Sequence, residues 1–348
     1  MGNEKGRKKT VVVADDDRTV RTVLAKMLDT EEFRVEQADR GERCLFLALE
    51  KPVDAFLIDI KMPGLSGIEL CRRLRSMERY RIAPIMFITS EETIENLSEG
   101  FAAGGTDLIL KPVNPVVLHA RLNAHLERVR YFNEMERARD YLKRYISSRT
   151  QLIVEAYSMT GVVPMPEHAE VCVMFSDVRG FTNLSRVIGI EDLFDNLSRL
   201  LGMQVDTVHR HNGYIDKFGG DGIMAIFDRE DMVENACRCA LEILGAARAM
   251  QQGGDGPALP LGIGIAKGEV MIGNIGSPEH LDYSAIGETV NLAARLCGHA
   301  KAGQVLVSSS VQATLAEDSE FSFGRGAAVD IKGFVDPVTV HALRVPGD

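Results

Sequence analysis

The first 120 residues or so repeat one pattern, a short apolar run followed by an amphipathic stretch, and this repeat restricts the possible fold strongly. The apolar runs, in order, are VVVA, FRVEQA, DAFLID, PIMFIT and DLIL. Strands that alternate with helices in this way predict a parallel sheet covered by helices on both faces. In such a doubly wound α/β domain, functional groups collect at the carboxyl ends of the strands.

From about residue 167 the order of the predicted elements changes. A strand (EVCVMFSDV) and two helical stretches precede a strand–turn–strand segment, YIDKFGGDGIMAIF. A helix, two adjacent strands, another helix and a closing pair of strands around IKGFVDPVTVHAL follow. The Gly-Gly pair marks a tight hairpin. This half therefore predicts an α+β domain with a mostly antiparallel sheet, different in kind from the first half.

The segment between the two patterns has neither Gly nor Pro from residue 116 to residue 160. Its apolar residues recur at spacings of three and four, which predicts one extended helix that could pair as a parallel coiled coil. An ordinary last helix with a solvated tail is the alternative. The chain of 348 residues is thus expected to divide into a disordered tail, an α/β domain, a helical linker and an α+β domain, with the bounds 1–9, 10–124, 125–165 and 166–348.

The composition is that of an ordinary globular protein and argues against several functions. Apolar residues make up 45% of the chain, and the net charge of -10 disfavours nucleic-acid binding. The six cysteines lack metal-like spacing and are expected to be reduced thiols. No apolar run approaches the roughly 18 residues that a membrane span needs. We therefore expect a cytoplasmic protein without membrane insertion.

Polar side chains end four of the predicted strands in the first half. Asp15 and Asp16 follow the first strand, Asp59 ends the third, and Thr89 and Lys111 end the fourth and fifth. Three carboxylates at one sheet edge repel one another, and a cation such as Mg²⁺ would relieve that repulsion. The hydroxyl and the ammonium add donors for a phosphoryl group. An acidic pair after a strand is, by itself, more typical of a helix N-cap.

These five positions lie in the motifs VVVADDD, LIDIKMPGLSG, MFITS and LKPVN, and this half resembles a two-component receiver domain. The resemblance implies a flavodoxin-like fold in which Asp59 accepts a phosphoryl group from a histidine kinase. It also implies that the acidic pair holds Mg²⁺ together with Asp59, while the hydroxyl and the lysine sense the product. The family often has an aromatic residue where this chain has Leu108, so the signal is expected to pass through the last helix and a dimer contact instead.

Two aspartates are the candidate metal ligands of the second half. Asp177 ends an apolar strand, and Asp221 lies on the Gly-Gly hairpin 44 residues later. If strand and hairpin are neighbours, the two carboxylates could hold a pair of divalent metals. The N–H groups of Gly180, Phe181 and Thr182, at a helix start, suit a triphosphate. Either aspartate alone is more typical of a cap or a turn.

The second half resembles the class III nucleotide cyclase catalytic domain, which is ferredoxin-like, through FSDVRGFT, DKFGGDGIMAIF, DYSAIGETVNLAARL and IKGFVDPV. The resemblance implies that Asp177 and Asp221, helped by the carbonyl of Val178, bind two Mg²⁺ or Mn²⁺ ions. It also implies a head-to-tail homodimer with two shared sites, in which the metal ligands come from one copy and the base reader from the other.

The same resemblance assigns the residues that bind the nucleotide. Lys217, assisted by Ser284, would read the base, Asn291 and Arg295 would support the ribose and the transition state, and Lys332 would hold the phosphates. Lysine only donates hydrogen bonds, so Lys217 suits the acceptor N1 of adenine and not the N1–H of guanine. The hydroxyl of Ser284 can accept or donate, so it discriminates less.

These features together imply a response-regulator adenylate cyclase that converts ATP to cyclic AMP and diphosphate, controlled by phosphorylation of Asp59. Its partners would be a second copy of the chain and a histidine kinase. Two alternatives stay open. The chain could be a guanylate or diguanylate cyclase, the latter because GGD is similar to that family's hairpin. It could also be a catalytically silent module whose interactions depend on phosphorylation.

Overall fold

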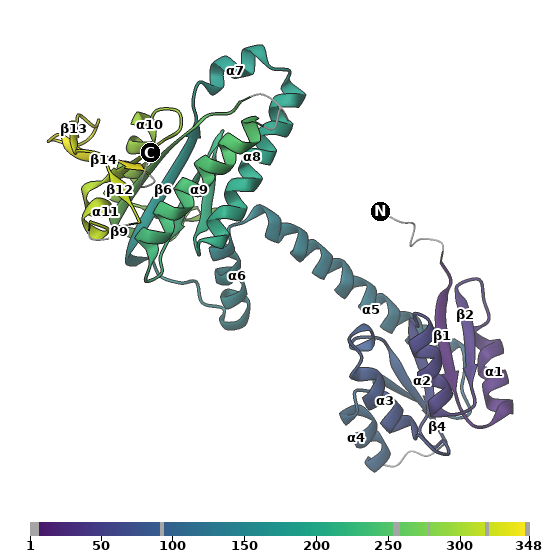
Figure 1. Ribbon diagram of the computed structural model, residues 1–348. Coiled ribbons are helices and arrows are strands. Elements are labelled where there is room, and N and C mark those ends of the chain that lie inside the picture. The colour runs from purple at the N-terminus through teal and green to yellow at the C-terminus, as the bar shows by residue number, and fades with distance from the viewer. Residues whose placement is uncertain (1–6, 91–93, 253–257, 278, 317–319, 345–348) are drawn as a thin grey trace. The chain divides into compact units, whose positions relative to one another are not determined.

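The structure is a computed structural model that describes residues 7–90, 94–252, 258–277, 279–316 and 320–344 (Figure 1). The chain forms two compact units, which divide between Asp140 and Tyr141. Each unit has its own sheet. Of the predicted tail, residues 1–6 lie outside the described residues. Arg7 pairs with Asp54 at 2.8 Å, and the first strand begins at Lys9.

The first unit contains a five-stranded parallel sheet in the order β2-β1-β3-β4-β5. The strands are β1 (Lys9–Ala14), β2 (Phe33–Ala38), β3 (Ala55–Asp59), β4 (Ile85–Thr89) and β5 (Asp107–Leu110). The helices are α1 (Arg18–Leu28), α2 (Gly41–Glu50), α3 (Gly67–Arg75), α4 (Ile94–Ala102) and α5 (Pro115–Leu142). All five predicted strands are present, which confirms the doubly wound α/β fold.

Apolar side chains fill both faces of this sheet because successive residues of a strand point to opposite sides. In β1, Val12 packs in a core with residues of α2 and α3, whereas Val11 and Val13 pack with residues of α1 and α5. The first part of α5 joins the second core through three leucines one helical turn apart, Leu118, Leu122 and Leu126. Burial on both faces explains the nearly continuous apolar runs of the strands.

The prediction of one extended helix after Pro115 is wrong, because α5 ends at Leu142 and a second helix, α6, covers Ser148–Thr160. Ser147 starts α6 as its N-cap, with its Oγ accepting the N–H of Thr150 over 3.1 Å. A capping serine satisfies amides at a helix start and so favours a new helix over continuation of the old one. The Ser-Ser pair was the sequence signal for this break.

The second unit is a mostly antiparallel nine-stranded sheet in the described residues, ordered β12-β14-β11-β9-β6-β8-β7, with β10 beside β9 and β13 beside β14. Only the pair β11–β9 is parallel among these described ladders. The strands are β6 (Glu167–Val178), β7 (Tyr214–Gly219), β8 (Gly222–Phe227), β9 (Leu261–Ser277), β10 (His280–Ile286), β11 (Gln304–Ser308), β12 (Ser322–Phe323), β13 (Ala327–Val329) and β14 (Val338–Arg344).

The helices of this unit cover both faces of the sheet. Besides α6, they are α7 (Phe181–Val187), α8 (Ile190–Arg210), α9 (Met232–Gln252), α10 (Glu288–His299) and α11 (Ser309–Thr314). α8 and α9 lie side by side over one core, while residues of α10 pack in the core on the other face (Figure 1). The predicted closing strands are shorter than expected, because the IKGFVDP segment forms turns between β13 and β14.

Helix α6 packs against the strands that follow it in the second unit. Ile153 packs against the core that contains Tyr283. Arg149, in the first turn of α6, lies 3.9 Å from a carboxylate oxygen of Asp228. Burial alone would lower the pKa of Arg149, but hydrogen bonding with Tyr283 contributes to raising it overall. The first turn of α6 is therefore linked to the end of β8 through Asp228.

The β7–β8 hairpin approaches the end of β6 more closely than a side chain would allow. A Cβ atom on Gly222 would come within 1.9 Å of the carbonyl oxygen of Ser176. Gly220, in the turn, has φ +68, a conformation that favours glycine. The Gly-Gly-Asp-Gly sequence thus brings the tip of the hairpin, which carries Asp221, beside the end of β6.

Replacing Gly222 by Ala is expected to destabilise the second unit by about 1–3 kcal/mol, because the added methyl group must displace backbone. Gly219→Ala, in the same hairpin, is the matched control, since a Cβ there meets nothing within 4 Å. Urea unfolding of the full chain measures both. Equal losses of unfolding free energy in the two variants would contradict this account of the hairpin.

Candidate functional site

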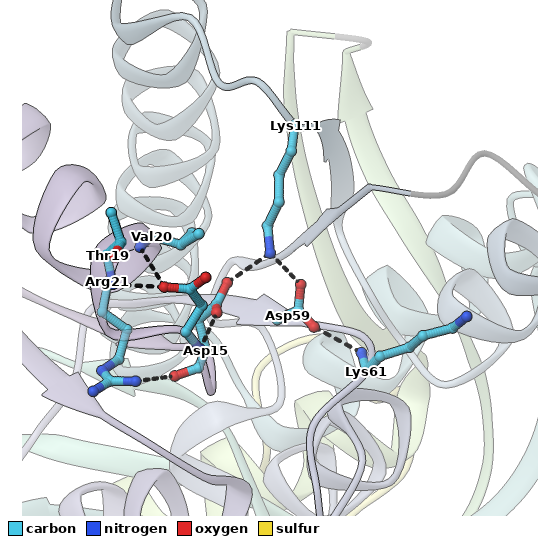
Figure 2. Close-up of polar contacts among 8 residues, drawn as sticks. Asp15, Thr19, Val20, Arg21, Asp59, Lys61 and Lys111 are labelled. Carbon is cyan, nitrogen blue, oxygen red and sulfur yellow. Dashed lines mark hydrogen bonds and ion pairs between the residues drawn. The ribbon is translucent and has the colours of Figure 1, made fainter.

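The carboxyl edge of the first sheet brings two carboxylates and one ammonium together. Lys111 Nζ lies 2.6 Å from Asp59 Oδ1 and 2.8 Å from Asp15 Oδ2, and Figure 2 shows it reaching between them. The second oxygen of Asp59 accepts the N–H of Lys61 over 2.9 Å. Both carboxylates belong to strand ends, as expected for a parallel sheet.

The charges of this pocket do not balance. Burial raises the pKa of Asp59, although the hydrogen bond and charge of Lys111 act against that increase. Burial alone would lower the pKa of Lys111, but Asp15 and Asp59 raise it overall. The two carboxylates face each other and already bind an ammonium. They could also bind Mg²⁺, because this ion prefers oxygen ligands that carry negative charge.

The other predicted receiver residues have different surroundings. Asp16 is exposed, and its neighbour Asp17 is the N-cap of α1, accepting the N–H of Thr19 over 2.6 Å. This bond and a second one from the next amide lower the pKa of Asp17. Thr89 is buried at the end of β4, and Leu108 packs against the core under α2 and α3. The N-cap interpretation therefore holds for Asp17.

In the second unit, Asp177 at the end of β6 and Asp221 at the hairpin tip are neighbours. The N–H of Val178 donates to Asp221 Oδ2 over 3.1 Å. Burial raises the pKa of Asp177, and the charge of Asp221 adds to that increase. The described residues contain no ready-made group of three or more His, Cys, Asp and Glu side chains for a metal. Two carboxylates with unbalanced charge nevertheless suit Mg²⁺ or Mn²⁺, which take further oxygen ligands from water and phosphates.

Arg179 was not predicted, although it stands inside the FSDVRGFT motif. Its Nη1 pairs with Asp177 Oδ2 at 3.1 Å, and its Nη2 donates to the carbonyl of Cys297 over 2.9 Å. Asp177 is thus linked to the last turn of α10. The same helix presents Asn291 and Arg295, which are both exposed and one turn apart.

The predicted base-reading residues meet at the junction of β7 and β10. Lys217 Nζ donates to Asp282 Oδ2 over 3.1 Å and lies 3.5 Å from Asp216 Oδ2. Ser284 Oγ donates to the same Asp216 oxygen over 2.6 Å. Burial alone would lower the pKa of Lys217, but the two carboxylates raise it overall. Asp216 and Asp282 were missed, although both lie next to motif residues, in DKFGGDG and DYSAIG.

The remaining predicted residues lie apart from these contacts. Gly180 has φ +72 and precedes Phe181 and Thr182 in the first turn of α7, a helix of seven residues. Lys332 is exposed in a turn between β13 and β14. Across the described part of the chain, no hydrogen bond joins the Asp177–Asp221 pair to the Lys217 group, and Arg295 has no hydrogen-bonding or ionic partner.

Comparison with known proteins identifies both halves. Residues 163–344, just over half of the chain, match the family model of the adenylate and guanylate cyclase catalytic domain. The chain belongs to this cyclase family. Residues 11–123 match the response regulator receiver domain, so a receiver is fused to a cyclase catalytic domain in one chain.

The similarity to known relatives covers only part of each relative. An uncharacterized protein of Mycobacterium tuberculosis is 34% identical over 211 residues, which cover 59% of this chain and 38% of the relative. The adenylate cyclase of Anabaena cylindrica is 27% identical over 223 residues, covering 61% of this chain and 44% of that protein. The match thus spans less than half the length of these curated relatives.

One solved structure is similar in fold to much of the chain. A bacterial light-regulated adenylyl cyclase gives a TM-score of 0.55 at 21% identity, covering 69% of this chain and 68% of that one. At this identity the match describes fold alone. None of the helices in the described residues is both long and apolar enough for a membrane span. Since the cyclase family includes enzymes for both nucleotides, the choice between ATP and GTP depends on the site itself.

Replacing Asp177 by Asn is expected to raise metal-free stability at pH 7 and to reduce stabilisation by Mn²⁺. A folded-state pKa raised above its unfolded value means that the carboxylate destabilises the fold above that pKa, so the advantage of Asn disappears as the pH falls towards 4. In the parent protein, Mn²⁺ at a hundred times its Kd adds about 2.7 kcal/mol. Thermal unfolding with and without Mn²⁺ measures both effects.

The comparison is made in an Asp15→Asn background, so that the receiver pocket does not contribute a second cation effect. Asp195→Asn is the control, because Asp195 is an exposed carboxylate of α8. Undiminished Mn²⁺ stabilisation in Asp177→Asn would show that the cation binds elsewhere.

Proposed function

We propose that this chain is an adenylate cyclase, which converts ATP to cyclic AMP and diphosphate at a site completed by a second copy. The observation that carries the proposal is the Lys217 ammonium, held beside Ser284 by Asp216 and Asp282. An ammonium has only donors, which match N1 of adenine and oppose the N1–H of guanine. A site that leaves a polar group of the wrong base unpaired can reject that base by several orders of magnitude.

The other residues suit transfer of the α-phosphate to the ribose 3′-oxygen, with loss of diphosphate. Divalent cations held by Asp177, Asp221 and the Val178 carbonyl would activate the attacking oxygen and bind the leaving phosphates. Arg295 is exposed and has no partner in the described residues, so its guanidinium is available to the charge that develops on the phosphate. Asn291, one turn earlier, shares its face of α10 and is placed to hold the ribose.

The triphosphate has four further candidate contacts. The first amides of α7, those of Gly180, Phe181 and Thr182, follow Asp177 closely in the chain and remain predicted phosphate ligands. Lys332 keeps the same predicted role, since its ammonium is exposed.

Exposed apolar side chains on the strands of the base reader support a site completed by a second copy. Phe218, next to Lys217, is 57% exposed, and Leu281 and Ile286 of β10 are each 53% exposed. Large apolar side chains that stay exposed near polar site residues are often covered in a protein interface. Twofold pairing over these side chains would place the metal-binding carboxylates of one copy opposite the base reader of the other. The symmetry would create two such shared sites in each dimer.

With Mn²⁺ or Mg²⁺, we expect the full chain to form cyclic AMP from ATP and at most one hundredth as much cyclic GMP or cyclic di-GMP from GTP. Lys217→Ala is expected to lower kcat/KM for ATP by about a hundredfold or more, the size of one lost base contact in a desolvated site. Lys301→Ala, which removes an exposed lysine elsewhere, is the control. Dominant turnover of GTP would favour a guanylate or diguanylate cyclase, and nucleotide binding without any product would favour the silent module.

The shared site predicts complementation between two inactive variants. Asp177→Ala and Lys217→Ala chains, mixed and allowed to exchange, are expected to regain about a quarter of the parent activity, because half the random dimers keep one intact site of two. Each variant alone supplies the baseline. Exchange of subunits is verified by the mass of the mixed dimer. If the mixed dimers are then no more active than either variant alone, a site shared in this way is ruled out.

The proposal includes control by phosphorylation of Asp59 in the cytoplasm, with Mg²⁺ held by Asp15, Asp16 and Asp59 and a histidine kinase as donor. Support comes from the contacts of Asp59, whose two oxygens bind the Lys111 ammonium and the Lys61 amide. The phosphoryl group carries about two negative charges, where the free carboxylate carries one. Lys111, and Thr89 at the neighbouring strand end, would bind it, and α5 begins four residues after Lys111.

Acetyl phosphate with Mg²⁺ is expected to attach one phosphoryl group to the parent chain and none to Asp59→Asn, as measured by intact mass. The rate of cyclic AMP formation is expected to change in the parent alone. Asp39→Asn, an exposed carboxylate of the same unit, serves as the control and should respond as the parent does. Phosphorylation of Asp59→Asn to the same extent would overturn the assignment.

A further inference from the structure

Among the described residues, the hydrogen bonds of the Ser284 hydroxyl all go to acceptors. It donates to Asp216 Oδ2 over 2.6 Å, and its second, longer contact is the carbonyl oxygen of Ala285 at 3.5 Å. Ser284 is 2% exposed, and the side chain of Asp216 is 3% exposed. Because a hydroxyl has a single hydrogen, donating it to the protein leaves only lone pairs for a ligand.

This direction depends on a charged Asp216. Burial raises the pKa of Asp216, while the hydrogen bond from Ser284 and the charge of Lys217 act to lower it. The ammonium lies 3.5 Å from the same oxygen that accepts from Ser284. A carboxylate held by a cation in this way is an acceptor only, so it cannot return a hydrogen to Ser284.

A hydroxyl whose hydrogen is fixed on the protein distinguishes adenine from guanine, whereas a freely rotating hydroxyl would not. Adenine offers N1 as an acceptor and its 6-amino group as a donor, and guanine offers the reverse pattern at N1 and O6. Lys217 as donor and Ser284 as acceptor match adenine at both positions and oppose guanine at both. A freely rotating Ser284 could instead turn its hydrogen to guanine O6 and offset part of the mismatch at Lys217.

We propose that Asp216 is a specificity-determining positioning residue, which makes Ser284 a pure hydrogen-bond acceptor and so excludes guanine. The inference rests on the proposed adenylate cyclase function, since it concerns the base that the same site accepts. Asp216 acts through Ser284 and does not itself need to touch the nucleotide. Asp282 differs from it, because Asp282 contacts Lys217 and makes no contact with Ser284 among the described residues.

The test compares kcat/KM for ATP and GTP in the full-length protein. Asp216→Asn places an amide beside Ser284, which can donate to Oγ and free the hydroxyl hydrogen for guanine. The preference for ATP over GTP is expected to fall about tenfold or more, the effect of one hydrogen bond of roughly 1.4 kcal/mol. Asp282→Asn is the matched control, because it removes one charge beside Lys217 and should affect both nucleotides alike.

A second variant separates specificity from folding. Ser284→Ala removes the acceptor, so adding Asp216→Asn to it should change the ATP/GTP ratio no further. Dissociation constants of 3′-deoxy-ATP and 3′-deoxy-GTP give the same ratio without turnover. A lower melting temperature of Asp216→Asn with an unchanged ratio would mean that the bond is merely structural and would overturn the inference. A parent protein that discriminates neither in binding nor in turnover would overturn the adenylate assignment itself.

Discussion

Repulsion between carboxylates placed at neighbouring strand ends is the constraint on which both halves of the protein depend. In the receiver, Asp15 and Asp59 share the single ammonium of Lys111. In the catalytic domain, Asp177 and Asp221 are separated in sequence but adjacent in space, and Arg179 offsets only one of them. Lys111 comes from a distant strand end and Arg179 reaches the last turn of α10, so a ligand that changes the local charge also changes the contacts that hold these elements together.

The sequence predicted the strands well because burial on both faces leaves a plain apolar signature, as in β1 and β3. It failed where local hydrogen bonding outweighs the apolar pattern. Residues 116–160 carry helical spacing throughout, yet the cap at Ser147 divides them into α5 and α6. The segment around Lys332 has strand-forming residues, but it turns between β13 and β14.

The residue types of the candidate site could be read from motifs, whereas their interactions could not. The contacts of Asp216 with Ser284 and of Asp282 with Lys217 join residues 68 and 65 positions apart, so no local pattern reveals them. A motif also cannot say whether a serine hydroxyl donates or accepts. That property depends on which acceptor the fold buries beside it, here Asp216.

The contacts of the first turn of α6 determine which strands a movement of this helix would reach. Arg149, in this turn, donates to Glu167 at the start of β6 over 3.4 Å and lies 3.9 Å from Asp228, which follows β8. Twisting α6 would therefore pull on the starting end of β6 and on the far end of β8, the two strands whose other ends lie beside Asp177 and Asp221. A torque on α6 would thus reach both aspartates along the strands that carry them.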